Sequence, residues 1–429
     1  MSGFQNPLTE EKVFKDPVHN YIYVQEVAIW RLINTPEFQR LRRVRQLGTS
    51  YLTFHGAEHS RFSHSLGVYE ITRRIISQFE RGDYPDWPKE EKLVALCAAL
   101  LHDVGHGPFS HSIEEAFQMH HEDWTCRIVL GDTEINKVLK DIAPDFPEKV
   151  AAVIAKDYDK PIVVNLVTSP LDADRMDYLL RDAHMTGVNY GTIDLDRILR
   201  LLRPHQGRIV VKESGMHAVE DYLMSRYQMY WQIYFHPVTR SSEILLRQIF
   251  RRLKELRYQD YRFKFMLEPI PQLIDGHVTV QQYLMLDEAL IQTTFNQWKF
   301  EDDPILSDLC SRFLDRRLYK YIQLECLDMD KVDHIREALR DVGLNPDYDL
   351  EIDFPTDLPY DVFRKNGSTE NQILLLGSKD TVREISEVSD IVRSISGIHR
   401  GKYHLYYPHM KLEAVKDRLP HDIQKLFVK

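Results

Sequence analysis

The spacing of apolar residues predicts helices over most of residues 1–330. The clearest pattern follows His64, where apolar residues recur at steps of four, three, four and four: Val68, Ile71, Ile75 and Phe79. This spacing places them and His64 on one inward face of a helix. Residues 93–101 are apolar throughout and predict a buried helix, which should end at the glycines and proline of residues 105–108.

Two later segments also predict helices. One should start at Ser169-Pro170, because serine caps helix N-termini and proline suits the first helical position. The other, residues 219–235, is unusually aromatic and should end before Pro237, since the residue before a proline disfavours helical geometry. A mainly α fold follows for this part of the chain.

The pattern changes beyond about residue 335. Three segments read as short strands: 350–354, 372–376 and 402–407. Helical stretches are expected at 330–344 and 381–395. We therefore expect a mainly α protein with a helical domain over residues 1–334, whose chemistry lies within 34–236, and a small α+β region over residues 335–429.

Composition narrows the class of protein. The 429 residues carry 55 Lys+Arg against 65 Asp+Glu, which gives a net charge of −10. Proteins that bind the nucleic-acid backbone need clustered cations, so this acidic balance argues against such binding. No run approaches the roughly 18 apolar residues of a membrane span, and the N-terminus lacks a secretory signal. We expect a soluble, cytoplasmic protein without nucleic-acid or membrane partners. The scattered cysteines predict neither a disulfide framework nor a zinc-thiolate site: Cys97, Cys126, Cys310 and Cys326.

Histidines are concentrated in one part of the chain. Of 19 histidines, residues 55–121 hold eight: His55, His59, His64, His102, His106, His111, His120 and His121. Histidine is the commonest metal ligand and moves protons near neutral pH, so the cluster indicates chemistry rather than packing. His102-Asp103, at the end of the predicted buried helix, can face one cation. The second such pair, His421-Asp422, has no candidate ligand beside it and is interpreted as accidental.

A divalent ion needs a further ligand from elsewhere in the chain. The helix expected after Ser169 carries four aspartates: Asp172, Asp174, Asp177 and Asp182. Asp174, Tyr178 and Asp182 share one helical face by their spacing of four, and we choose Asp174 as the ligand. Alternatively, these are first-turn acids favoured by the helix dipole, which explains Asp172 well and Asp182 poorly.

Four segments carry a family resemblance: Thr35–Gly48, Arg61–Gly67, His102–His111 and Asp172–Asp182. Together they closely resemble the HD-domain deoxynucleoside triphosphate triphosphohydrolases, over about residues 12–250. The resemblance implies that water attacks the α-phosphorus of a dNTP and that a deoxynucleoside and intact triphosphate are released. It also implies one divalent ion held by four residues: His64, His102, Asp103 and Asp174. This donor set suits Mg, Mn, Fe, Zn or Ni, so the sequence does not identify the ion.

The resemblance also implies catalytic roles for four residues: His106, His111, His121 and Glu122. We favour His111 as the general acid that protonates the leaving oxygen, because imidazole is a natural proton donor at this pH. The other two imidazoles would orient water or phosphate, and Glu122 would set imidazole orientation. As an alternative, His111 is a structural residue beside a capping box formed by Ser112 and Glu115.

Nine residues match substrate contacts of the family: Gln46, Leu47, Arg61, Arg175, Tyr178, Asp182, Arg226, Tyr230 and Tyr234. The three arginines suit phosphate oxygens, although family members often have lysine in place of the second. Gln46 and Asp182 match residues that bond the 3′ hydroxyl. Leu47 matches an apolar residue near C2′ that would disfavour ribose, and Tyr178 should pack on sugar or phosphate. The last two tyrosines share a helical face with Arg226, but such aromatic stripes are commonly part of the core.

Regulation is implied as well, because relatives of this kind are commonly homotetramers with activating nucleotides bound between subunits. Four residues match that pocket: Lys12, Val13, Gln39 and Arg42. Asn34 departs from the aspartate of the guanine-activated member and offers one acceptor and two donors, so guanine selectivity is in doubt. Alternatively, the two cations are plain surface residues.

Two other functions are alternatives to dNTP hydrolysis. The first is an HD phosphohydrolase of another nucleotide, such as a monophosphate, a cyclic nucleotide or guanosine tetraphosphate, which the arginine set and Gln46-Leu47 disfavour. The second is a nucleotide sensor without turnover, which the intact ligand set and His111 disfavour.

Overall fold

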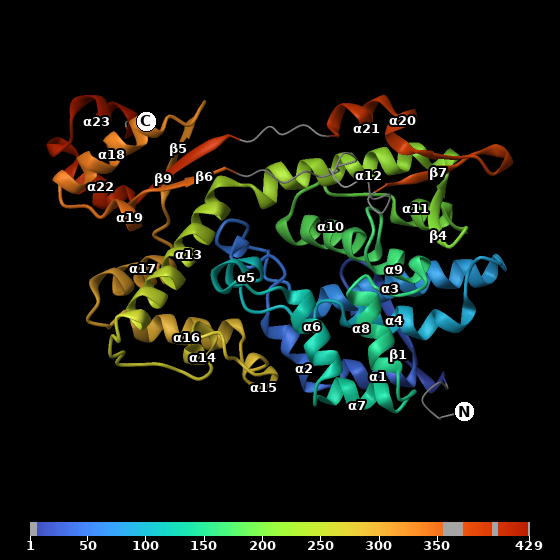
Figure 1. The fold of residues 1–429 in the computed structure, drawn as a ribbon. Helices are drawn as coiled ribbons and strands as arrows, with labels where there is room; N and C mark the ends of the chain where they lie inside the picture. The colour runs from blue at the N-terminus through green and yellow to red at the C-terminus, as the bar shows by residue number, and fades with distance from the viewer. Residues whose placement is uncertain (1–6, 355–371, 397–401, 428–429) are drawn as a thin grey trace.

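The computed structural model describes residues 7–354, 372–396 and 402–427. These residues are mainly helical, as predicted, with small sheets (Figure 1). The chain begins with a hairpin followed by four helices: β1 (Pro7–Asp16), β2 (Asn20–Glu26), α1 (Val27–Ile33), α2 (Pro36–Arg40), α3 (Arg61–Arg81) and α4 (Lys92–Leu101). The next elements are α5 (His111–Phe117), α6 (His121–Leu130), α7 (Glu134–Lys140), α8 (Phe146–Ile154), α9 (Pro161–Val167), α10 (Ala173–Thr186), α11 (Leu195–Leu201), β3 (Leu202–His205), β4 (Arg208–Lys212), α12 (Met216–Met229) and α13 (Pro237–Tyr258).

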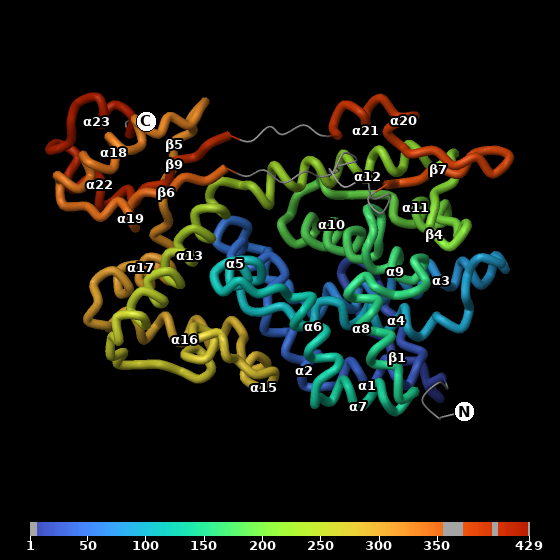
Figure 2. Tube along the Cα trace, in the orientation of Figure 1, coloured from blue at the N-terminus to red at the C-terminus, as the bar shows by residue number. Residues whose placement is uncertain are grey.

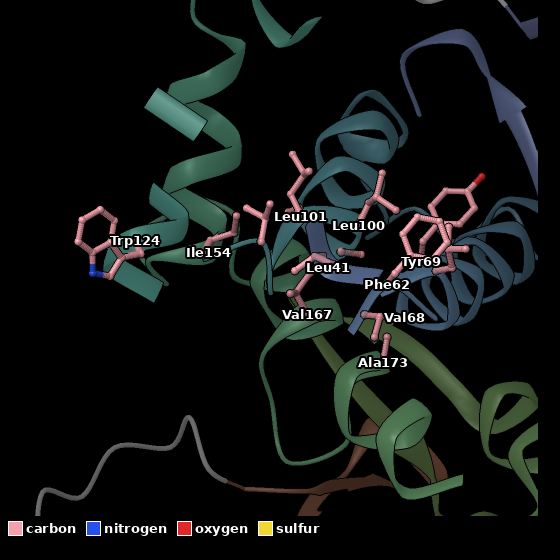
Figure 3. Close-up of a cluster of buried hydrophobic side chains, with 14 of the residues drawn as sticks. Leu41, Phe62, Val68, Tyr69, Leu100, Leu101, Trp124, Ile154, Val167 and Ala173 are labelled. Atoms are coloured by element: carbon pink, nitrogen blue, oxygen red, sulfur yellow. The ribbon is translucent and has the colours of Figure 1, made fainter. Parts of the chain in front are cut away.

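Helices α3 and α4 form the centre of the apolar core. The predicted stripe of α3 is buried, with its four apolar side chains at most 1% exposed. Every residue of α4 from Val94 onward is buried, which confirms the predicted apolar helix. Figure 3 shows Val68 of α3 beside Ala173 of α10, and α3 contacts both α4 and α10. Burying these apolar faces stabilises the arrangement that brings α3, α4 and α10 together.

Helix α10 does not start where the sequence predicted. Its first residue is Ala173, and Asp172 rather than Ser169 is the N-cap. Asp172 Oδ1 accepts the backbone N–H of Arg175 at 2.7 Å, and its Oδ2 accepts that of Ser169 at 2.7 Å. A carboxylate caps a helix at least as well as a hydroxyl, and here it also closes the preceding turn. Asp174 consequently lies in the first turn of α10.

The aromatic helix predicted over residues 219–235 exists but changes its geometry near its end. Helix α12 ends at Met229 and continues as a π-helical turn over Tyr230–Tyr234. The next helix, α13, has Pro237 at its first position, so the predicted end before this proline is confirmed. π-Helical turns are rare and often occur at functional sites.

The rest of the chain contains shorter helices and strands. They are α14 (Ile270–Ile274), α15 (Val280–Tyr283), α16 (Glu288–Trp298), α17 (Pro304–Leu314), β5 (Lys320–Leu324), α18 (Met329–Asp341), α19 (Pro346–Asp349), β6 (Glu351–Asp353), β7 (Leu374–Leu376), β8 (Val382–Glu384), α20 (Ile385–Val388), α21 (Asp390–Ile395), β9 (Tyr403–Tyr407), α22 (His409–Val415) and α23 (His421–Phe427). The three predicted strands and the helix at 330–344 are present. The single helix expected at 381–395 is wrong: residues 382–384 pair with β7 as β8, and the rest forms two short helices, α20 and α21, separated at Ser389.

The strands beyond residue 335 divide between two sheets. One sheet has the order β3-β4-β7-β8, with β4 and β7 parallel, and the other has the antiparallel order β5-β9-β6. Figure 2 shows β7 beside β4 at one end of the molecule and β5, β6 and β9 at the other. Strands from before and after residue 335 therefore pair in both sheets. Among the described helices, none has both the length and the hydrophobicity to cross a membrane.

Candidate metal centre and the groups around it

The four predicted metal ligands converge from three parts of the fold. His64 lies in the first turn of α3, His102-Asp103 follows the last residue of α4, and Asp174 lies in the first turn of α10. His64 Nε2 is 3.0 Å from Asp174 Oδ1 and 3.7 Å from Asp103 Oδ2. His102 Nε2 is 3.3 Å from Asp103 Oδ1 and 3.7 Å from Asp174 Oδ1. Each imidazole thus lies close to both carboxylates, and His64, His102 and Asp174 each bring one ligand atom to within 4.8 Å of the other two.

The orientation of each imidazole in this cluster is fixed by a hydrogen bond at Nδ1, the ring nitrogen that faces away from the carboxylates of the cluster. His64 Nδ1 donates to Asp177 Oδ2 at 2.8 Å, and His102 Nδ1 donates to the carbonyl oxygen of Ala99 at 2.9 Å. The two Nε2 atoms therefore face the carboxylates as ligand atoms, the usual arrangement of metal-binding histidines. His102 Nε2 is buried without a hydrogen-bond partner. The donor set and this unpaired atom fit a divalent ion.

The pKa values of side chains in the cluster are strongly shifted from their usual values. Burial would lower the pKa of His64, but the Asp174 and Asp177 carboxylates outweigh burial and raise it to about 10. Burial would raise the pKa of Asp103, but the Arg61 guanidinium, which contacts this carboxylate, and neighbouring imidazoles hold it well below its usual range. The carboxylates are therefore ionised and attract positive charge to the centre of the cluster.

A second group of imidazoles lies next to the ligands. The rings of His106 and His121 stack, with centroids 3.8 Å apart and planes at 14°. His121 Nδ1 donates to Glu114 Oε2 at 3.1 Å, and His106 Nδ1 lies 2.9 Å from Glu114 Oε1. His106 Nε2 lies 3.3 Å from Asp103 Oδ1. Burial and the nearby Arg61 charge lower the pKa of His106 to about 4, so its ring is neutral at neutral pH.

Glu114, not Glu122, is the carboxylate that orients these imidazoles. Glu122 Oε1 accepts from Lys156 Nζ at 2.7 Å on the protein surface, so the structure pairs it with a lysine, whereas Glu114 contacts the imidazoles. Burial would raise the pKa of Glu114, but the three imidazoles that contact it outweigh burial and hold it well below its usual range. The sequence contained one signal for this residue, since Glu114 follows His111 at a helical spacing of three.

His111 is the exposed member of the group. Its side chain is 78% exposed, and its Nδ1 lies 3.4 Å from Glu114 Oε2. Helix α5 begins at His111 with Ser110 at the N-cap position, so the capping box suggested for Ser112 and Glu115 does not form. His111 is thus accessible to a bound molecule and remains in contact with a carboxylate.

Two of the predicted phosphate-binding arginines lie together and have unpaired N–H groups. Arg175 donates to the Ser169 carbonyl oxygen at 2.8 Å and contacts Asp172, while Arg226 donates to Tyr230 Oη at 3.3 Å. The Nε atoms of both arginines are buried without a partner. Arg226 lies close enough to Arg175 for its charge to oppose the rise in the Arg175 pKa that Asp172 causes. Two adjacent guanidinium groups with free donors form a site that favours an anion.

Asp182 lies at the other end of the predicted substrate set. It is buried, accepts from Tyr234 Oη at 2.9 Å and faces His59 Nε2 at 2.7 Å. The backbone of His59 in turn accepts the N–H of Gln46 at 3.0 Å, and Gln46 Oε1 is buried without a partner. Gln46 and Asp182 are therefore connected through His59, although 136 positions separate them (182 − 46). Sequence reasoning did not assign His59 a role.

The aromatic residues of the set contact one another as well. Tyr234 lies 6.3 Å from Tyr178 and 5.3 Å from Tyr230, measured between ring centroids in edge-to-face geometry. Leu47 is half-buried against the apolar core. A series of contacts thus runs from Arg226 through the two tyrosines Tyr230 and Tyr234 to Asp182.

Comparison with known proteins agrees with this geometry. The HD domain family matches residues 61–182, and the HD associated region matches residues 193–268. The uncharacterized protein YwfO of Bacillus subtilis is 53% identical over 94% of this chain and 93% of its own length. A phosphohydrolase crystal structure from Bacteroides thetaiotaomicron, 27% identical, covers 93% of this chain and all of its own with a TM-score of 0.81. The chain belongs to the HD-domain phosphohydrolases.

A more distant relative has a more specific name. The deoxynucleoside triphosphate triphosphohydrolase SAMHD1 of Gallus gallus is 27% identical over 56% of this HD-domain chain and 45% of its own length. Similar enzymes of Dictyostelium discoideum and Xenopus laevis are 24% and 25% identical over 77% and 74% of the chain.

The predicted regulatory residues of this HD-domain protein lie on β1 and near α1 and α2. Lys12 pairs with Glu10 at 3.1 Å, and Val13 is 48% exposed. Asn34 Nδ2 donates to the Trp30 carbonyl oxygen at 2.6 Å. Arg42 Nε donates to Gln39 Oε1 at 2.8 Å, so two of the set contact each other.

Proposed function

We propose that this HD-domain phosphohydrolase is a metal-dependent dNTP triphosphohydrolase, which converts a dNTP to a deoxynucleoside and inorganic triphosphate. The proposal is carried by the contacts of two imidazoles with two carboxylates, close to buried guanidinium donors. The SAMHD1 relatives, named deoxynucleoside triphosphate triphosphohydrolases, support it. A divalent ion, either Mg, Mn, Fe, Zn or Ni, would act as a Lewis acid on the α-phosphate and neutralise its charge.

The chain's own residues would bind and protonate the substrate. Arg61, Arg175 and Arg226 would hold the triphosphate oxygens, with Arg61 exchanging part of its contact with Asp103 for phosphate. His111, exposed and next to Glu114, would donate the proton that the 5′ oxygen requires on leaving. His106 and His121, both in contact with Glu114, would orient the attacking water or the phosphate.

The sugar would be recognised by the residues near Asp182, at the end of the contact series that begins at Arg226. Gln46 and Asp182 would bond the 3′ hydroxyl, because His59 and Tyr234 position the Asp182 carboxylate and Gln46 Oε1 is buried without a partner. Leu47 would oppose a 2′ hydroxyl, which would find no partner there. Tyr178 and the two other tyrosines would pack along the nucleotide. A cytoplasmic location, as expected from the sequence, is part of the proposal.

Regulation belongs to the same proposal. A nucleotide bound between subunits of a homotetramer would contact Lys12, Val13, Asn34, Gln39 and Arg42, of which the hairpin residues are exposed in the single chain. Asn34 makes the base of this activator an open question for experiment.

Incubating the protein with each dNTP alone and in pairs, with Mg²⁺ or Mn²⁺, tests the proposal. Chromatography should detect a deoxynucleoside and inorganic triphosphate as first products, and pairs should react faster than single nucleotides if an activator binds. Release of orthophosphate or pyrophosphate would instead indicate another phosphohydrolase reaction. Binding of dNTPs by metal-loaded protein without any turnover would identify a nucleotide sensor and exclude the enzyme.

A further inference from the structure

Asp177 of α10 is a buried carboxylate that joins three elements beside the metal ligands. Its Oδ2 accepts from His64 Nδ1 and from Arg181 Nε, both at 2.8 Å. Its Oδ1 accepts from His19 Nε2 at 2.5 Å and from Arg181 Nη2 at 3.0 Å. The side chains of Asp177, His19 and Arg181 are at most 1% exposed. With four donors and no access to water, this carboxylate is fixed in position.

Two of the groups that hold Asp177 depend on the turn between β1 and β2. His19 lies in this turn, and Asp16 ends β1. Asp16 Oδ1 accepts the backbone N–H groups of Val18 and His19, each at 2.9 Å, which folds the turn. Asp16 Oδ2 accepts from Arg181 Nη1 at 2.8 Å. The turn therefore contacts Asp177 directly through the His19 side chain. It also contacts Asp177 indirectly, because Asp16 binds Arg181 and Arg181 binds Asp177.

Helix α3 is shaped to admit the same carboxylate. Gly67 follows His64 by three positions, so both lie on one side of α3. A Cβ atom at Gly67 would lie 1.8 Å from Asp177 Oδ1 and 2.5 Å from Arg181 Nη2. Both distances are far below van der Waals contact, so glycine is required for α10 to approach α3 this closely. The packing and the hydrogen bonds thus place Asp177 at one point.

We propose that the β1–β2 turn is a positioning element of the metal centre, acting through His19 and Asp177 on the ring of His64. Of the proposed function, this requires only that His64 binds a divalent ion. Asp177 keeps the His64 proton on Nδ1 and directs Nε2 at the ligand cluster, which is what a carboxylate behind a metal-binding histidine does. Asp177 and His19 are positioning residues, because neither faces the ligand cluster.

Binding of Mn²⁺ to the nucleotide-free protein tests this, with free Mn²⁺ measured by electron paramagnetic resonance. His19→Phe removes the donor to Asp177 and should weaken Mn²⁺ binding by about 10-fold or more. His19→Gln keeps an N–H donor and should restore most of the affinity. Lys15→Ala is the matched control, because Lys15 bonds Asn20 in the same hairpin without touching Asp177, and it should bind Mn²⁺ as the wild type does.

Gly67→Ala tests the position of the Asp177 carboxylate by a change in α3, because the added methyl group would displace that carboxylate and leave the hairpin unaltered. It should weaken Mn²⁺ binding by a similar factor of about 10. Circular dichroism and thermal melts in the absence of metal should show folded proteins, and Gly67→Ala provides the comparison if His19→Phe does not fold. Wild-type affinity in both folded variants would overturn the inference, as would equal weakening by Lys15→Ala. Wild-type protein that binds Mn²⁺ but hydrolyses no dNTP would overturn the proposed function and leave the positioning role intact.

Discussion

The rings of His106 and His121 stack with centroids 3.8 Å apart, and one carboxylate, that of Glu114, lies against the Nδ1 atom of each. Burial and the Arg61 charge lower the pKa of His106, so this ring of the stack is neutral at neutral pH. Glu114 therefore sets the direction of two side chains at once. The pair lies between the ligand Asp103 and the exposed His111.

Replacing Glu114 by glutamine should impair catalysis more than binding. The amide would present an N–H group to one of the imidazole N–H donors, so the rings would lose their fixed direction. We expect kcat to fall by about 100-fold, the lower end of the contribution of acid–base groups, with a smaller change in KM. Steady-state kinetics of dNTP turnover measures both values.

The adjacent Glu115 provides the control for this substitution. Glu115 is on the same helix but exposed, and it pairs with Arg247 at 3.0 Å. Glu115→Gln should therefore leave kcat unchanged. Equal kinetics of the two variants would show that Glu114 does not orient catalytic groups.

The two His-Asp pairs of the chain offer a matched test of the metal centre. Asp103→Asn removes one of two carboxylates from the ligand cluster and should lower Mn²⁺ affinity and turnover by at least about 100-fold. Asp422→Asn changes the aspartate of the exposed pair, whose nearest partner is His334 at 3.2 Å, and should change neither. Chelation of the wild-type protein should abolish turnover, and added Mn²⁺ should restore it. Full activity after exhaustive chelation would contradict a metal-dependent reaction.

The proximity of the four candidate ligands was predictable because each of them lies next to a strong local signal. His64 begins an apolar stripe, and His102-Asp103 ends a fully apolar helix, so burial fixes where these side chains are. Asp174 was selected by helical spacing although the start of α10 was misplaced, because a shift of three residues in the helix start does not alter the spacing of four within it. The short strands after residue 335 were found for the same local reason.

The groups that hold these ligands were not predictable in the same way. His19 contacts Asp177 across 158 positions (177 − 19), and His59 contacts Asp182 across 123 (182 − 59). Each is a single polar residue without periodicity, so its partner is defined only by tertiary packing. The same holds for β7, three residues long, whose parallel pairing with β4 spans more than 160 positions.

Removing residues 335–429 should destabilise the helical part, because both sheets would lose strands. Without β7, the edge of β4 and buried residues such as Val211 would be exposed. We expect the chain shortened to residues 1–334 to melt at least 5 °C lower than the full chain, or to aggregate. Differential scanning calorimetry and light scattering measure these outcomes. An unchanged melting temperature would instead support residues 1–334 as an independent domain.

Tyr234→Phe should weaken recognition of the 3′ hydroxyl. The substitution removes the O–H donor to Asp182 and keeps the ring, so the carboxylate loses one of the two contacts that position it. A hydrogen bond to a charged group contributes about 1.5–3 kcal/mol, so kcat/KM for dATP should fall by roughly 10- to 100-fold. For dideoxy-ATP, which lacks the 3′ hydroxyl, the fall should be much smaller, because Asp182 then has no hydroxyl to bond. Tyr227→Phe, one helical turn before Tyr230 on α12, is the control and should affect neither substrate. An equal loss for both substrates would show that Tyr234 supports the site generally and does not act through the 3′ hydroxyl.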